Sequence, residues 1–227
     1  MNKYLGLICS VLAVALPPTS SAVAQLANAP VYANPTISGV RIAGDYAFGV
    51  NEESGKNSTF AARGQIGVSK VILGAGIGVV DLAQTNEATY MVSLAVRPVG
   101  GGGRLVAVAV QAGIGFTEAS VTGFTDALKT VDIPVSVALG LHVPLIAAQV
   151  QPWVAPRYTF RRQSLGNDSD NRNHFGVSAG IDARLLMGLG AQVAVDFQSI
   201  PELTGGATFD DAKLQPFLAS IGLHFGI

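Results

Sequence analysis

The residues most able to do chemistry lie in one polar stretch, residues 167–174, which reads Asn-Asp-Ser-Asp-Asn-Arg-Asn-His. Its oxygen atoms could hold a cation. A histidine beside carboxylates and a serine could also form the active site of a hydrolase. The candidate side chains are Asp168, Ser169, Asp170, His174, Asp210 and Asp211. The stretch lacks the spacing and the glycine of a calcium-binding loop. We therefore interpret it as a solvated loop, and predict no metal ion, no cofactor and no catalytic residue.

Thiol chemistry is absent from most of the chain, because Cys9 is the single cysteine. Cys9 lies in an N-terminal segment that is typical of a secretory signal peptide. Lys3 supplies the positive charge, residues 4–16 are apolar, and Ala22-Val23-Ala24 is an A-x-A cleavage motif. We predict cleavage after Ala24, which would leave a mature chain without disulfides or a cysteine nucleophile.

The composition is unusual for a protein surrounded by water. Hydrophobic residues make up 49% and charged residues only 13%, whereas soluble domains carry about 25% charged residues. The net charge of -1 gives no basic patch for nucleic acid. Much of the surface is therefore expected to face something other than water.

Alternation of apolar with polar or small residues dominates the chain after residue 36, and this pattern predicts β-strands. Each strand is near the length that crosses a bilayer at a tilt. We expect about ten strands, with eight as the alternative if one hairpin within residues 70–96 is dropped. The expected strands cover residues 40–50, 60–69, 71–79, 90–97, 106–116, 132–143, 149–161, 174–185, 189–198 and 217–227.

The polar content favours a closed antiparallel transmembrane β-barrel over a soluble barrel. The non-apolar face is mostly Gly, Ala and Ser with scattered charges, which suits a barrel interior better than a surface in water. Connections alternate short and long, as short periplasmic turns and longer extracellular loops do. Pro152 and Pro156 fit a closed barrel poorly, so we expect a bulge or bend between them.

Aromatic residues gather at the loop ends of the expected strands, where they would form a girdle at the outer membrane interface. The members of this girdle are Tyr46, Phe48, Phe60, Tyr90, Phe116, Tyr158, Phe160, Phe175, Phe197 and Phe217.

The signal peptide, the strand pattern and the last strand together resemble the small outer-membrane β-barrel family of Gram-negative-type bacteria. The resemblance covers residues 37–227. It implies a place in the cell outer membrane among its lipids, and recognition of the C-terminal strand by the barrel-assembly machinery. In that family the last strand usually ends in an aromatic residue, whereas here Phe225 precedes the final Ile227 by two positions.

Three segments follow from this reading: a signal peptide (residues 1–24), a periplasmic lead-in (25–36) and a barrel domain (37–227). A polar network is expected on the lumen face, because charges taken from water need partners. Its members are Arg41, Asp45, Arg63, Arg97, Asp132, Arg157, Arg161, Asp182, Arg184 and Asp196.

The function expected from the sequence is non-enzymatic, either structural or mediated by the outer loops with an extracellular ligand that the sequence does not identify. A narrow channel for small polar solutes is the alternative. Ten strands lie nearer the size at which side chains fill a barrel, but the third, fifth and sixth expected strands offer Gly, Ala and Ser inward, which would leave some lumen open. A hydrolase with a rim active site is the second alternative.

Overall fold

The computed structural model describes residues 26–227 except residues 28, 55–56, 82–85, 102–103, 121–125, 186 and 202–213. The predicted signal peptide and the acidic pair Asp210 and Asp211 lie outside the described residues. Within the described part of the chain, no helix is long and apolar enough to cross a membrane.

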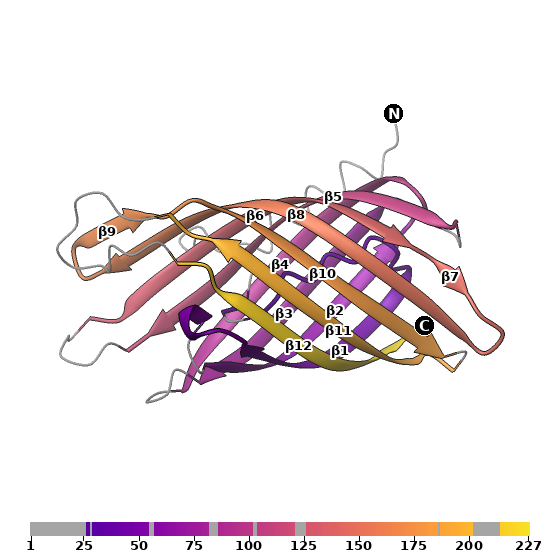
Figure 1. The fold of residues 1–227 in the computed structure, drawn as a ribbon, viewed down its shortest axis with the longest axis horizontal. Coiled ribbons are helices and arrows are strands. Elements are labelled where there is room, and N and C mark those ends of the chain that lie inside the picture. Colours follow the sequence, from indigo (N-terminus) through magenta and orange to yellow (C-terminus); the bar gives the residue numbers. More distant parts are fainter. Residues whose placement is uncertain are drawn as a thin grey trace.

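Ten long antiparallel strands form a closed barrel (Figure 1). They are β1 (Gly39–Gly49), β2 (Ser58–Val68), β3 (Val71–Asp81), β4 (Asn86–Val99), β5 (Val106–Ala119), β6 (Leu128–Leu141), β8 (Ala148–Leu165), β10 (His174–Leu185), β11 (Leu189–Ser199) and β12 (Phe217–Gly226). Each strand pairs with the next, and β12 pairs with β1 to close the ring. The short strands β7 (Val143–Pro144) and β9 (Asp168–Asn171) both pair with β8. The prediction of a ten-stranded closed barrel is confirmed.

The two ends of the barrel differ in their connections. At one end lie the tight turn at Ser69 and Lys70, the last residues of β4, β6 and β10, the first residues of β5, β8 and β11, and the C-terminus. We call this the turn end. The opposite end, which we call the loop end, carries β9 and a short 3-10 helix, η1 (Glu52–Ser54). Figure 1 shows β9 at one end of the tilted strands, and β7 with the C-terminus at the other.

The polarity of the barrel is the reverse of that of a soluble protein. Apolar side chains that face outward are exposed: the exposed fraction is 66% for Phe60 and 71% for Leu223. Inward-facing charged side chains are covered, with Asp196 0% and Arg157 3% exposed. Along β1 and β4, buried and exposed residues alternate strictly over most of the strand. An apolar exterior around a polar interior is the arrangement of a barrel whose outer face meets lipid.

The expected bulge at the prolines is not present. The pairing of β8 with β10 keeps one register through Pro152 and Pro156, from His174↔Thr159 to Leu185↔Ala148. On the other side, the pairing of β8 with β6 has no partner at either proline, and its register is the same before and after the gap. Both prolines therefore direct their missing N–H toward β6, so only one ladder loses hydrogen bonds. The register shifts instead between β4 and β5, at residues 96–99.

Candidate functional site: the filled interior of the barrel

The chain that precedes β1 lies inside the barrel. Nearly all the described residues of 26–37, which we call the inner segment, are buried. Residues 25–36 are predicted from the sequence to be a periplasmic lead-in, whereas the structure places the described part of that stretch inside the lumen. The segment fits there because it is made of small or uncharged residues, and because many inward positions of the wall are alanine or glycine, which leave space in the lumen.

The inner segment passes along the barrel from the turn end to the loop end. Ile37 packs with Ile72, Ala95 and Ala109 near the turn end. Farther along, Val31, Tyr32 and Ala33 pack against a middle layer of the wall formed by Ala138, Trp153, Ala155 and Ala194. Leu26 and Ala29 pack with Ala47 and Met91, at the level of the aromatic residues near the loop end. The segment therefore occupies most of the length of the lumen.

Side chains of the wall hold the inner segment at both ends. At the loop end, the Ala27 N–H donates to Thr89 Oγ1 at 3.0 Å, and Thr59 Oγ1 donates to the Ala27 carbonyl at 2.6 Å. Near the turn end, Gln151 Oε1 accepts from Asn34 Nδ2 at 3.1 Å and from Thr36 Oγ1 at 2.6 Å.

Arg97 fixes the point where the inner segment enters the lumen. Its Nη1 donates to the carbonyls of Pro35 at 2.9 Å and Ile37 at 2.8 Å, and its Nη2 donates to the Ser69 carbonyl at 2.6 Å. The residue is among the largest fully buried side chains of the described chain. A buried guanidinium that is bonded to three carbonyls ties the segment to the wall beside the β2–β3 turn.

Eight of the charged residues expected in the lumen form four ion pairs. Arg63 Nε and Asp45 Oδ2 are 2.6 Å apart, and Arg161 contacts Asp132 through two hydrogen bonds of 2.6 and 2.7 Å. The other two pairs are Arg157 with Asp196, which includes an Nη2–Oδ2 contact of 2.7 Å, and Arg41 with Asp182. All four pairs join different strands of the wall, so their charges are compensated without the inner segment.

Neighbouring polar groups complete this network. Ser178 also donates to Asp196, Gln192 donates to Asp45, and His224 Nε2 lies 3.0 Å from Asp182 Oδ1. The guanidinium of Arg63 lies 3.5 Å from the ring centroid of Tyr32, which is a cation–π contact between the wall and the inner segment. The interior thus holds four ion pairs and their polar neighbours around an uncharged peptide.

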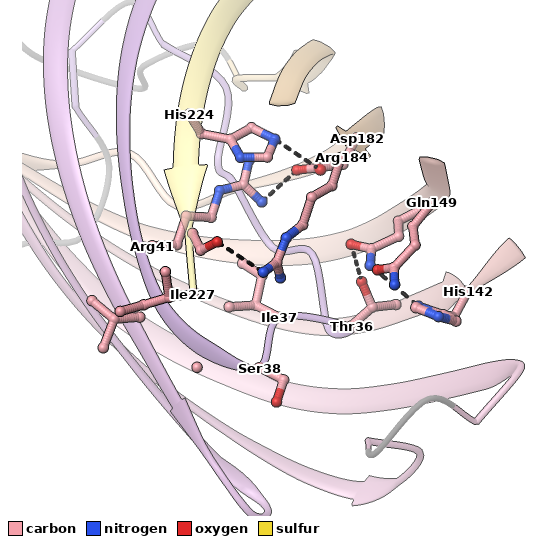
Figure 2. A pocket seen from close by; sticks show the side chains of 14 residues that line it. Thr36, Ile37, Ser38, Arg41, His142, Gln149, Asp182, Arg184, His224 and Ile227 are labelled. Atoms are coloured by element: carbon pink, nitrogen blue, oxygen red, sulfur yellow. Dashed lines mark hydrogen bonds and ion pairs between the residues drawn. The ribbon is translucent and has the colours of Figure 1, made fainter. Parts of the chain in front are cut away.

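A polar cavity of about 400 Å³ opens at the turn end, next to the point where the inner segment enters the lumen (Figure 2). Figure 2 shows Arg184 pointing into this space, where its Nη2 donates to the Gly226 carbonyl at 2.8 Å. Thr36 and Ile37 line the same cavity, so the inner segment forms its inner limit. We call this cavity the vestibule.

The polar rim residues do not form an assembled catalytic group. His174 is buried, and its Nδ1 lies 3.1 Å from the Arg172 carbonyl oxygen. Asp170 pairs with Arg172 at 3.8 Å, and Ser169 makes a 3.5 Å contact with Arg162. Among the described residues, no hydrogen bond connects His174 to Asp168, Ser169 or Asp170, and no group of three His, Cys, Asp or Glu side chains could hold a metal ion.

The ten aromatic residues expected to form a girdle all lie at least partly exposed on the outer face of the barrel. Several contact one another across strands: Tyr46 and Phe60 have ring centroids 4.6 Å apart, and Tyr158 and Phe175 have centroids 4.8 Å apart. Tyr90 pairs in register with Phe116, which continues the row onto β4 and β5. The position of this aromatic row at a membrane interface remains a prediction.

The inner segment was not predicted from the sequence, although two features of the sequence point to it. Residues 26–38 contain no charged residue, which is unusual for a linker in water. The inward faces of several strands carry small residues, so wall side chains alone leave part of the lumen open. Together these features indicate that another element fills the barrel.

The fold and its inverted polarity define a transmembrane type of antiparallel β-barrel with a filled polar interior. No protein-family model and no curated protein matches the chain. Among solved structures, the N-terminal β-barrel domain of Pseudomonas aeruginosa OprF is similar at 10% identity and a TM-score of 0.38, covering 84% of this chain and 98% of that domain.

Two further solved structures are similar at the same low level. The outer-membrane protease OmpT from Escherichia coli matches at 9% identity and a TM-score of 0.45, over 84% of this chain and 94% of its own. The translocator domain of the autotransporter NalP from Neisseria meningitidis matches at 11% identity and a TM-score of 0.42, over 99% and 95%.

Proposed function

We propose that this protein is an integral outer-membrane β-barrel that is closed by its own inner segment and has a structural role or a role mediated by its outer loops. The observation that carries the proposal is the filled lumen. The inner segment lies inside the barrel along most of the length of the lumen, while the outer face of the barrel is apolar. The proposal includes signal cleavage after Ala24 and contacts of the C-terminal strand with the assembly machinery. The rim residues give no support for a hydrolase.

Conductance tests whether the lumen is closed. The purified, folded protein in a planar lipid bilayer should stay closed for most of the recording, because a peptide and paired side chains occupy the path. Protein that resists protease and shows the gel mobility of a folded barrel provides the control for insertion. Steady, stepwise current from the full chain would contradict a closed barrel.

Thiol labelling on intact cells tests whether the barrel spans the outer membrane and which of its ends faces the outside of the cell. Ser169→Cys and Asn86→Cys, both exposed at the loop end, should react with an impermeant maleimide. Met187→Cys lies at the turn end and is 82% exposed, so it should react only after the outer membrane is opened. The parent chain is the background control, because its one cysteine lies in the predicted signal peptide. Labelling of position 187 with protection of 169 would mean the reverse orientation.

A further inference from the structure

We propose that the inner segment is a displaceable closure, and that its departure from the lumen opens a passage for small ions and polar solutes. This inference rests on the proposed function, because it requires the barrel to span a membrane. It goes beyond that function by assigning a second, open state to the same molecule. An open state is accessible because the wall pairs eight of its charges within itself and the segment carries none.

The four ion pairs of the wall would stay paired without the inner segment, whereas Arg97 would keep only its bond to the Ser69 carbonyl. Asp45 pairs with Arg63 between neighbouring strands β1 and β2, and Asp132 pairs with Arg161 between β6 and β8. Asp196 with Arg157 and Asp182 with Arg41 are likewise contacts between wall strands. Departure of the segment therefore leaves no carboxylate of these four pairs uncompensated, and water entering the lumen would solvate the pairs.

The inner segment has no charged residue, and apart from its bonds to Arg97 its hydrogen bonds to the wall join neutral groups. Water can replace such bonds once the segment and the lumen are hydrated. Apolar packing is therefore the main contact that holds it in the lumen, through buried Leu26, Val31 and Ile37. The cation–π contact of Arg63 with Tyr32 is additional to the ion pair that Arg63 makes with Asp45, so that arginine keeps a partner.

The space that the inner segment occupies is wide enough for water and small ions to pass. It accommodates a polypeptide main chain with its side chains, and such a bore also admits water and small ions. At Gly140 a Cβ atom would lie 2.8 Å from Cγ of Pro35 and 3.1 Å from Cγ2 of Thr36, so the missing side chain makes room for the segment. The vestibule already forms an opening of about 400 Å³ at the turn end.

The charges around this passage predict its selectivity. The lumen network contains six arginines and four aspartates, so 6 − 4 leaves two positive charges without a carboxylate in that set. The two are Arg97, which binds main-chain carbonyls, and Arg184, which points into the vestibule. We expect the open passage to prefer anions modestly, because both charges lie at one mouth.

Deletion of the closure is the direct experiment. A variant lacking residues 26–36 is compared with the full chain in planar bilayers, using potassium chloride as the only solute. A minor open state populated at about 0.1–10% predicts that the deletion raises the mean current on the order of 10- to 1,000-fold. Protease resistance and gel mobility show whether the variant folds. If it does not, the paired substitution Arg97→Met with Gln151→Leu, which weakens the turn-end attachments, replaces it and should raise the current in the same direction.

A reversible lock provides the matched control in a chain of full length. Ala27→Cys with Thr89→Cys puts a cysteine at each of two positions that are in direct contact, since the Ala27 nitrogen now lies 3.0 Å from Thr89 Oγ1. The oxidised form should lose the openings of the parent, and reduction should restore them, while each single substitution keeps them in both conditions. The inference is overturned if the reduced full chain never opens, or if a folded deletion or weakened variant conducts no more than the parent. Steady current that the lock leaves unchanged would instead contradict the closed barrel itself.

Discussion

Asp196→Asn should lower the free energy of unfolding by about 3–5 kcal/mol, because it leaves the Arg157 guanidinium buried without its counter-charge. Both side chains are completely covered in the structure. Arg157 has a second partner in Ser178 Oγ at 2.8 Å, but a neutral hydroxyl does not compensate a cation. Urea titration of the refolded protein in lipid vesicles, followed by tryptophan fluorescence, gives the measurement. The single tryptophan, Trp153, lies on the strand that carries Arg157.

The control for this prediction removes both charges. Arg157→Met combined with Asp196→Leu should cost clearly less than the single substitution, because no unpaired charge stays in the interior. Lys129 and Glu118, at 3.9 Å on the exposed surface, supply the matched exposed pair, and Glu118→Gln should cost about 0–1 kcal/mol. A single substitution at Asp196 that costs no more than Glu118→Gln would show that water reaches this part of the lumen.

The ten strands could be predicted from the sequence because alternation is a local property. Residues on one face of a strand are two apart, so the apolar set Val106, Val108 and Val110 identifies β5 without knowledge of its neighbours. The structure extends several strands at the loop end, for example β4 to Asn86 and β6 to Leu128, where polar residues continue the hairpins beyond the apolar band. Polar strand ends lack the alternation that made the central part recognisable.

The partners inside the lumen could not be predicted in the same way. Parity places Arg157 and Asp196 on the inner face, but their pairing depends on the register of three strands, β8, β10 and β11. The path of the inner segment is harder still, because it has no period and its bonds reach residues more than one hundred positions away, as from Asn34 to Gln151. Its position follows only from the volume that a closed ring of strands leaves empty.

The prolines of β8 show the opposite error, where a local rule predicted too much. Proline removes one ladder hydrogen bond and is therefore expected at edges or bulges. Pro152 and Pro156 are four residues apart, so both missing donors face the same neighbour, and the ladder with β10 stays intact. A rule about single residues does not contain this information on spacing.

Val137→Arg should lower the free energy of unfolding by about 2–4 kcal/mol, the cost of an arginine on the lipid face near the bilayer midplane. Val137 is 47% exposed on the outer face and pairs with Val110. It lies between the level of the aromatic residues, where Ile133 pairs with Phe160, and the turn end of β6 at Leu141. Its neighbour Ser136 is buried in the filled interior in register with Arg157, so an arginine there would meet both crowding and like charge.

The matched control places the same charge on the outer face at a different depth. Leu145, 55% exposed in the connection at the turn end, should accept arginine at a cost of about 0–1 kcal/mol, because its side chain can reach the interface. Val137→Leu, which keeps an apolar side chain toward lipid, should change the stability by no more than about 0.5 kcal/mol. Titrations of the three variants in vesicles of one lipid composition give a direct comparison. Equal costs for arginine at positions 137 and 145 would mean that the outer face of β6 does not contact the hydrocarbon core.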